Sequence, residues 1–198
     1  MDEPEWLTAE ELMAWKALAG VLFLLPAALD SQLQRDSGLA MADYMVLVML
    51  SERDDHCMRM SELATSASTS QSRLSRIVAR LEAAGYVTRE MAPDDRRAVL
   101  ATLTEAGLAK LVAAAPGHVA QVRRLVFDRL TPAQVLSLNE IARALAHPDD
   151  PANCELSTKN SRTVGLFSQF AGGARRRGPF GCAGGRHSRR RAAPGRRG

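Results

Sequence analysis

The sequence is poor in the residues that build metal sites and disulfide frameworks. It has three cysteines and four histidines among 198 residues. Cys57, Cys154 and Cys182 are an odd number at spacings that fit neither a zinc site nor a set of disulfides, and a reducing cytoplasm suits them. The chain also lacks a paired nucleophile and base, metal-ligand spacing and a phosphate-binding glycine loop. We therefore expect no enzymatic activity, no metal and no cofactor.

Signals for export or membrane insertion are also lacking. No window approaches the long uncharged apolar run that a membrane span needs. The most apolar stretch, residues 17–29, resembles the core of a signal peptide in length, but acidic rather than basic residues precede it. The sequence therefore predicts a cytoplasmic protein with no membrane partner.

Positive charge is unevenly distributed along the chain. Residues 147–198 hold 11 Lys and Arg against 3 Asp and Glu, a net charge of +8, whereas residues 1–146 hold 15 against 19, a net charge of −4. The last part is rich in Gly, Arg, Ala and Pro and has no apolar periodicity, so we expect a basic, disordered tail over 147–198. An acidic body repels phosphate, so any nucleic-acid contact by residues 1–146 needs a local basic patch.

The first predicted element is a long helix. Thr8 and Glu11 form a capping-box pattern, and apolar residues then recur at steps of three and four as far as Leu33. Pro26 should interrupt or kink this helix, and Gly38 should end it. A second apolar face indicates more than one packing partner. We therefore expect residues 1–37 to be a dimerisation helix.

Further along, the pattern predicts a mainly α fold with a small β-hairpin. Helical patterns cover residues 41–52, 61–67 and 69–84, and the segment 54–57 between them is polar and predicted to be a loop. Strand-like runs flank the turn at Pro93, Asp94 and Asp95 within residues 86–104. A long helix over 105–129, kinked at Pro116, and a last helix capped by Thr131 complete the body.

One of the short helices, residues 69–84, has a pattern suited to DNA. Apolar residues occupy one face, and Arg73, Arg76 and Arg80 run down the other at i, i+3 and i+7. Arginine can bond guanine in a bidentate manner, and Ser or Gln near the helix start can reach base edges or phosphates. The predicted DNA-binding residues of this recognition helix are Thr69, Ser70, Gln71, Ser72, Arg73, Arg76 and Arg80, the last of them directed to phosphate. A solvated arginine face gives the same pattern, but the preceding helix and the following hairpin favour DNA.

The tip of the hairpin is the second predicted contact. Asp95, Arg96 and Arg97 directly follow the turn, and an arginine held at a loop tip suits the narrow minor groove. Residues 69–97 hold six arginines against four carboxylates, while the other residues of the body sum to −6. Positive charge is thus concentrated in this segment, although a charged turn in solvent would give the same pattern.

These residues resemble the MarR (multiple antibiotic resistance regulator) family of winged helix-turn-helix transcription regulators. The segment 95–107, DRRAVLATLTEAG, is similar to the wing signature of that family. Ser61-Glu-Leu-Ala, Ser75-Arg, Arg80-Leu-Glu and Gly85-Tyr-Val-Thr-Arg also fit its helix-turn-helix in order and spacing. The resemblance covers about residues 8–146 and does not include the tail.

The resemblance implies a homodimer that binds double-stranded DNA at a pseudo-palindromic operator, as a repressor released by a small aromatic or anionic effector. Residues 38–104 would form the DNA-binding lobe, and 105–146 the C-terminal dimerisation helices. Arg97 matches the arginine that enters the minor groove, Asp95 the acidic residue that braces it, and residues 70–76 the base-reading segment. The resemblance indicates no effector-binding residue.

Other interpretations remain open at this point. The arginine-rich tail is also typical of nonspecific nucleic-acid-binding or architectural proteins, and GC-rich DNA can encode such a segment without any function. Cys57 could sense oxidants, but an ordinary loop cysteine explains it as well. His56, His118 and Trp15 could line an effector pocket, although structural roles are expected for them.

Overall fold

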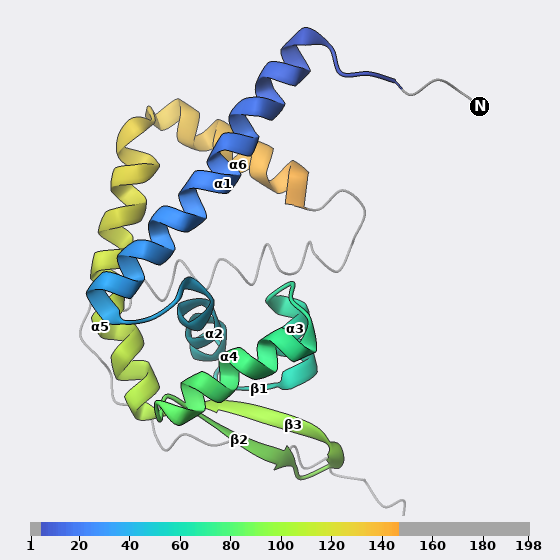
Figure 1. Cartoon of the computed structure of the whole chain (residues 1–198), viewed down its shortest axis with the longest axis vertical. Coiled ribbons are helices and arrows are strands. Elements are labelled where there is room, and N and C mark those ends of the chain that lie inside the picture. Colours follow the sequence, from blue (N-terminus) through green and yellow to red (C-terminus); the bar gives the residue numbers. More distant parts are fainter. Residues whose placement is uncertain (1–4, 147–198) are drawn as a thin grey trace, which may run out of the picture.

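The computed structural model describes residues 5–146, so the predicted tail over 147–198 lies outside the described residues. The first helix and the last two helices extend from a lobe made of the other helices and a small sheet (Figure 1). The elements, in order, are α1 (Ala9–Ser37), α2 (Met41–Ser51), β1 (Cys57–Arg59), α3 (Met60–Ser66), α4 (Gln71–Ala83), β2 (Val87–Ala92), β3 (Asp95–Leu103), α5 (Glu105–Leu125), the 3₁₀ turn η1 (Phe127–Arg129) and α6 (Pro132–Ala146).

Helix α1 begins and ends where the sequence predicts. The Oγ1 of Thr8 accepts the Glu11 amide at 3.2 Å, and the Glu11 carboxylate accepts the Thr8 amide at 2.7 Å. Gly38 ends the helix in the left-handed region, with φ of 65°, which favours glycine. Pro26 lies inside one unbroken helix, so the predicted interruption does not occur.

Helix α1 also corrects the expectation that no window approaches a membrane span. It contains an 18-residue window of mean hydropathy 1.9, long and apolar enough to cross a bilayer by length and composition, and only 6% of that window is buried in the protomer. Core helices of soluble proteins pass the same test. The large exposed side chains of α1 include Trp15, Phe23 and Leu24.

The lobe is built around α2 and the inner faces of α3 and α4. Leu47 and Leu50 of α2, Leu63 of α3 and Leu74 of α4 are completely buried. Helices α3 and α4 are joined by a short turn in which Ser68 has a positive φ of 46°. Both helices lie within two residues of the bounds that their periodicity predicts.

The hairpin forms as predicted, but it belongs to a three-stranded antiparallel sheet in the order β1-β3-β2. Cys57 pairs with Thr102, and Arg59 with Leu100, so β1 adds to the outer edge of β3. The prediction that Cys57 is a loop residue is therefore wrong, since it begins a strand and is buried. Three residues are too few to show the alternation that identifies a strand in a sequence.

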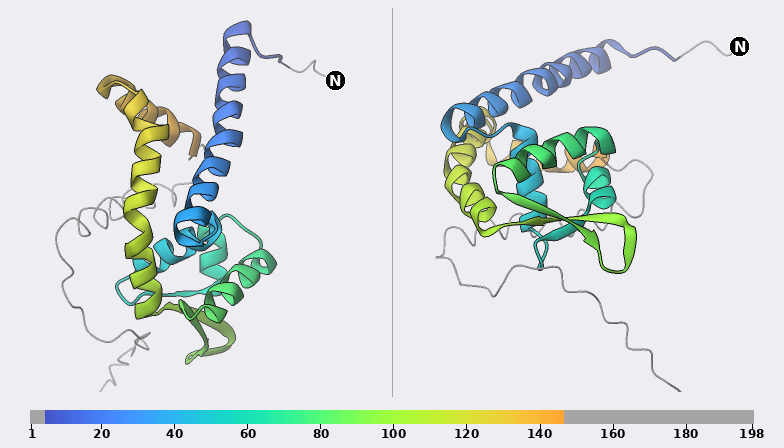
Figure 2. Two further views of the ribbon diagram at one scale, coloured as in Figure 1. Left: turned by 60° about the vertical axis from the view of Figure 1, so that its left-hand side comes forward. Right: turned by 60° about the horizontal axis from the view of Figure 1, so that its bottom comes forward.

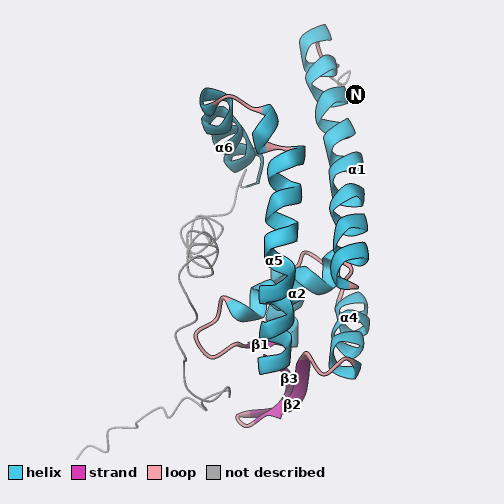
Figure 3. Ribbon diagram, turned by 90° about the vertical axis from the view of Figure 1, so that its left-hand side faces the viewer, coloured by secondary structure: helices cyan, strands magenta, loops and turns pink. Residues whose placement is uncertain are grey.

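The C-terminal helices differ slightly from their prediction. Helix α5 ends at Leu125 rather than at Arg129, and Pro116 lies inside it. The predicted cap of α6 is present, because Thr131 and Gln134 exchange backbone-to-side-chain hydrogen bonds of 2.9 and 3.3 Å. Helices α1 and α5 pack against each other, while α6 lies beside the far end of α5 (Figure 3). The β2–β3 hairpin projects at the opposite end of the molecule (Figure 2).

Candidate nucleic-acid interface

Helix α4 presents one apolar and one polar face. Leu74, Ile77, Val78 and Leu81 are buried. Ser70 is the N-cap residue: its Oγ accepts the amide of Arg73 at 3.3 Å and lies 3.2 Å from the Oγ of Ser72. Ser70 is therefore exposed, and it also stabilises the first turn of α4 as its N-cap.

Most predicted contact residues of this helix lie on its exposed face. Gln71, Ser72, Arg73 and Arg76 are exposed, whereas Thr69 is half-buried in the turn before the helix. Among the described residues, neither Arg73 nor Arg76 forms an ion pair. Two guanidinium groups one turn apart are thus available to a ligand of opposite charge.

Arg80 differs from the other two arginines. Its Nη2 lies 2.6 Å from Oδ1 of Asp43, and its Nε lies 3.2 Å from both carboxylate oxygens. Asp43 is in α2, and only 6% of its side chain is exposed. The hydrogen bond to Asp43 raises the pKa of Arg80 further above its usual value. Sequence periodicity places Arg80 on a surface stripe but cannot reveal a partner 37 residues away.

At the wing, the structure describes the side chains of Asp95 and Arg97, while the side chain of Arg96 lies outside the described part. A carboxylate oxygen of Asp95 accepts the backbone amide of Arg97 at 2.9 Å. Arg59, at the end of β1, bonds Asp94 at 2.7 Å and lies 3.8 Å from Asp95. The guanidinium of Arg97 is exposed and has no ion-pair partner within residues 5–146.

Helix α4 forms a further ion pair, this one with the wing. The Nε of Arg89 in β2 donates to a carboxylate oxygen of Glu82 in α4 at 2.9 Å, and its Nη2 donates to the same oxygen. This hydrogen bonding lowers the pKa of Glu82. Helix α4 is therefore bonded on one side to α2 and on the other to the strand that leads into the wing.

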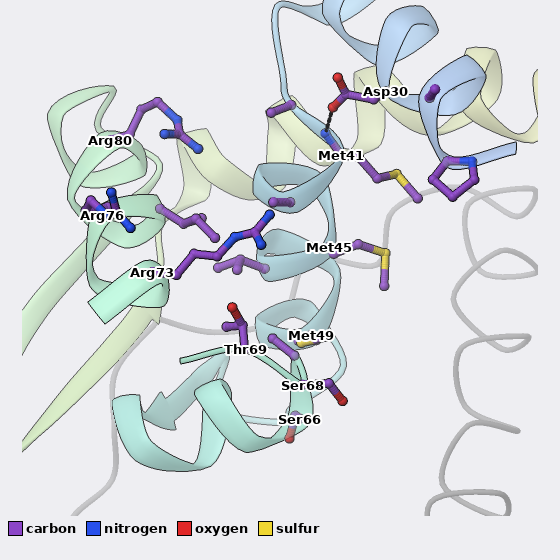
Figure 4. A pocket seen from close by; sticks show the side chains of 17 residues that line it. Asp30, Met41, Met45, Met49, Ser66, Ser68, Thr69, Arg73, Arg76 and Arg80 are labelled. Carbon is purple, nitrogen blue, oxygen red and sulfur yellow. Dashed lines mark hydrogen bonds between the residues drawn. The ribbon is translucent and has the colours of Figure 1, made fainter. Parts of the chain in front are cut away.

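An open groove of about 1120 Å³ lies between α1, α2 and α4. Arginines 73, 76 and 80 line one wall, and methionines 41, 45 and 49, one helical turn apart on α2, line another. The Arg73 side chain extends from α4 toward α2, and Asp30 of α1 accepts the Met41 amide at 2.7 Å (Figure 4). The groove thus offers both cationic and apolar contacts.

Buried polar side chains lie on α1, α2 and α5, which pack against one another. The rings of Tyr44 and His118 lie 4.7 Å apart, and both residues are buried, as is Gln32. Burial raises the pKa of Tyr44 to about 12 and lowers that of His118. A core position for His118 agrees with the structural role expected from the sequence.

Comparison with known proteins identifies this architecture. The sequence model of the MarR family matches residues 37–98, from the last residue of α1 into β3. The MarR family regulator Sco3205 of Streptomyces coelicolor, solved in complex with DNA, is 48% identical, with a TM-score of 0.72, over 77% of this chain and 96% of Sco3205. The chain belongs to the MarR family of transcriptional regulators.

Two further relatives agree with this assignment. AbsC, a MarR family regulator of the same organism, is 43% identical, with a TM-score of 0.68, over 72% of this chain and 96% of AbsC. The transcriptional regulator PrsX of Escherichia coli is 31% identical over 112 residues. That alignment spans 57% of this chain and 58% of PrsX.

Membership of the MarR family confirms several predictions. The chain is a DNA-binding transcription regulator with a winged helix-turn-helix fold, and it is not an enzyme. Helix α4 is the predicted recognition helix of this fold, and the β2–β3 hairpin is its predicted wing. The individual base and phosphate contacts, the dimer and the effector remain proposals.

Proposed function

We propose that the protein is a cytoplasmic, homodimeric repressor that binds a pseudo-palindromic operator. The observation that carries this proposal is a set of exposed arginines that form no ion pair within residues 5–146, namely Arg73 and Arg76 on α4 and Arg97 on the wing. Helix α4 is narrow enough to enter a major groove, where its arginines would bond guanine. The wing would place Arg97 in the adjacent minor groove, where narrow A·T-rich tracts attract arginine.

Apolar surface on two separate helices supports a dimer. Phe23 and Leu24 of α1 are 80% and 74% exposed, and Leu136 and Ile141 of α6 are 67% and 57% exposed. A membrane around α1 would leave α6 uncovered, whereas a second copy of the chain can cover both helices. Burying a large apolar side chain gains about 1.5–3 kcal/mol. Several such side chains per protomer offset the roughly 4–15 kcal/mol that association costs.

The groove suits a small organic anion. Arg73 and Arg76 supply positive charge, while Met45 and Ile77 supply apolar contact surface. An aromatic carboxylate bound there would engage the same arginines that we propose to contact DNA, and it would release the operator. Benzoate and related carboxylates should therefore weaken DNA binding and raise the melting temperature of the free protein.

Selection of duplexes from a random-sequence pool tests the DNA-binding proposal. We expect the protein to enrich one short pseudo-palindrome and to sediment as a dimer at micromolar concentration. Arg76→Ala should cost about 1–3 kcal/mol per half-site and relax one operator position. Arg53→Ala is the matched control, because it removes an exposed arginine that is already paired with Glu62, at 2.6 Å.

Other outcomes would contradict the proposal. Equal binding to any DNA or RNA would indicate the nonspecific or architectural function suggested by the net charge of +8 over residues 147–198. A monomer would exclude a palindromic site. An unchanged operator preference in Arg76→Ala would show that α4 does not read bases through this residue.

A further inference from the structure

Arg80 contacts a buried carboxylate at the junction of three helices. Three hydrogen bonds of 2.6–3.2 Å join its guanidinium to Asp43, whose side chain is 6% exposed. The fork geometry of this bidentate pair fixes both the distance and the orientation of α4 relative to α2. Arg73 and Arg76, by contrast, have no ion-pair partner among the described residues.

Asp43 also organises the start of α2. Its Oδ2 accepts the amide of Ala40 at 3.1 Å, which caps the helix. The next amide, that of Met41, donates to Asp30 of α1 at 2.7 Å. The N-terminus of α2 is thus bonded to α1 through Asp30 and to α4 through Asp43, and Arg80 connects the recognition helix to this junction.

We propose that Arg80 is a positioning residue, which holds α4 in its reading orientation through Asp43 and does not itself bind phosphate. Asp43 occupies the Nε and Nη2 edge of the guanidinium. Turning that edge toward a phosphate would leave the buried carboxylate of Asp43 unpaired, which is strongly unfavourable, so the 56% exposed side chain has only its remaining N–H groups to offer. Arg76 lies one turn before Arg80 on the same helix, so a change in the tilt of α4 displaces the base-contacting side chains. This inference rests on the proposed operator binding and assigns Arg80 a role different from that of Arg73 and Arg76.

Asp43→Asn separates positioning from direct contact, because the two roles predict opposite effects. Asparagine is nearly isosteric and can still accept the Ala40 amide, but it removes the charge that holds Arg80. If Arg80 positions α4, operator affinity should fall about tenfold while affinity for random duplex stays within about twofold. If Arg80 binds phosphate, releasing it should leave operator affinity unchanged or increase it, and either result would overturn the proposal.

The salt dependence of Arg80→Gln provides a second test. Each phosphate contact contributes about 0.9 to the slope of log affinity against log salt, so losing two contacts per dimer would reduce the slope by about 1.8. If Arg80 positions α4, Arg80→Gln should leave the salt slope on random duplex unchanged and should lose as much operator affinity as Asp43→Asn. The double variant, Asp43→Asn with Arg80→Gln, should lose no more operator affinity than either single variant, because both substitutions disrupt the same interaction. A reduced slope or additive losses would refute the assignment.

Controls distinguish these outcomes from general instability. Asp128→Asn makes the same chemical change in an exposed ion pair, in which Asp128 lies 3.1 Å from Arg123. It should alter neither the operator affinity nor the salt slope on random duplex. Arg80→Lys keeps one charged donor and should recover part of the operator affinity. All binding is measured well below the melting temperature of each variant. If the wild-type protein selects no sequence, the proposed function fails; if it does, only the role of Arg80 is in question.

Discussion

Replacing Gly107 by alanine tests a close approach between α5 and Tyr86, the residue that precedes β2. A Cβ at this position would lie 2.1 Å from the carbonyl oxygen of Tyr86 and 2.8 Å from Cδ1 of Leu103. The first of these neighbours is backbone. The same Tyr86 oxygen accepts the amide of Thr104, the N-cap of α5, at 3.0 Å. The carbonyl therefore cannot move away without loosening the junction between the wing and α5.

The cost follows from three contributions. Overpacking costs about 1–3 kcal/mol, and weakening one buried hydrogen bond costs about 0.5–1.5 kcal/mol. Alanine recovers about 1 kcal/mol because it favours helix more than glycine does. We expect a net destabilisation of about 0.5–3.5 kcal/mol per protomer, which lowers the melting temperature by about 1–14 °C.

Thermal unfolding followed by circular dichroism at one fixed protein concentration measures this effect. Gly117→Ala is the matched control in the same helix. Its Cβ would meet the Nε2 of Gln32 at 3.2 Å, and that side-chain end can shift by a few tenths of an ångström. We expect Gly117→Ala to melt near the wild-type temperature. A Gly107→Ala variant as stable as Gly117→Ala would show that the reasoning from this close contact is wrong.

Three further predictions concern the wing, the core and the tail. Arg97→Ala should weaken operator binding by about 1–3 kcal/mol and lower the preference for A·T pairs flanking the recognition site, as measured by selection from a random pool. Burial lowers the pKa of His118 below its usual 6.5, so the unfolded chain binds the proton more readily and stability should fall as the pH drops below about 6.5. His118→Phe, melted between pH 8 and 5.5, should lose part of that dependence; an unchanged profile would exclude His118 as its source. Deleting residues 150–198 should preserve the selected sequence but reduce the salt slope on random DNA, and equal slopes would show that these residues do not contribute to binding.

Local sequence signals predict most of the elements of this fold. The reciprocal bonds of Thr8 and Glu11, the left-handed Gly38 and the cap at Thr131 depend on residues within four positions of one another. The recognition helix is equally local, because its buried side chains repeat at helical spacing. Such signals require no knowledge of the rest of the chain, so they can be recognised in the sequence alone.

The sequence alone also determines the charge distribution and the resemblance to the MarR family. The arginines of residues 69–97 are concentrated in one segment of an otherwise acidic body. The wing segment from Asp95 to Gly107 matches a family pattern, which points to Gly107 without explaining it. The physical reason for this glycine, the approach of the Tyr86 carbonyl, is visible only when α5 packs beside the sheet.

Residues that look alike in the sequence can have different partners, and only the tertiary structure decides which partner each one meets. Arg73, Arg76 and Arg80 lie on one stripe, but among the residues that the structure describes only Arg80 of the three meets a buried carboxylate, because α2 packs beside the later part of α4. Strand β1 exists only because β3 offers it a free edge with which to pair. Both interactions join segments 37 to 45 residues apart. Periodicity reports the direction of a side chain from its own helix or strand, whereas the partner it meets depends on how distant segments pack.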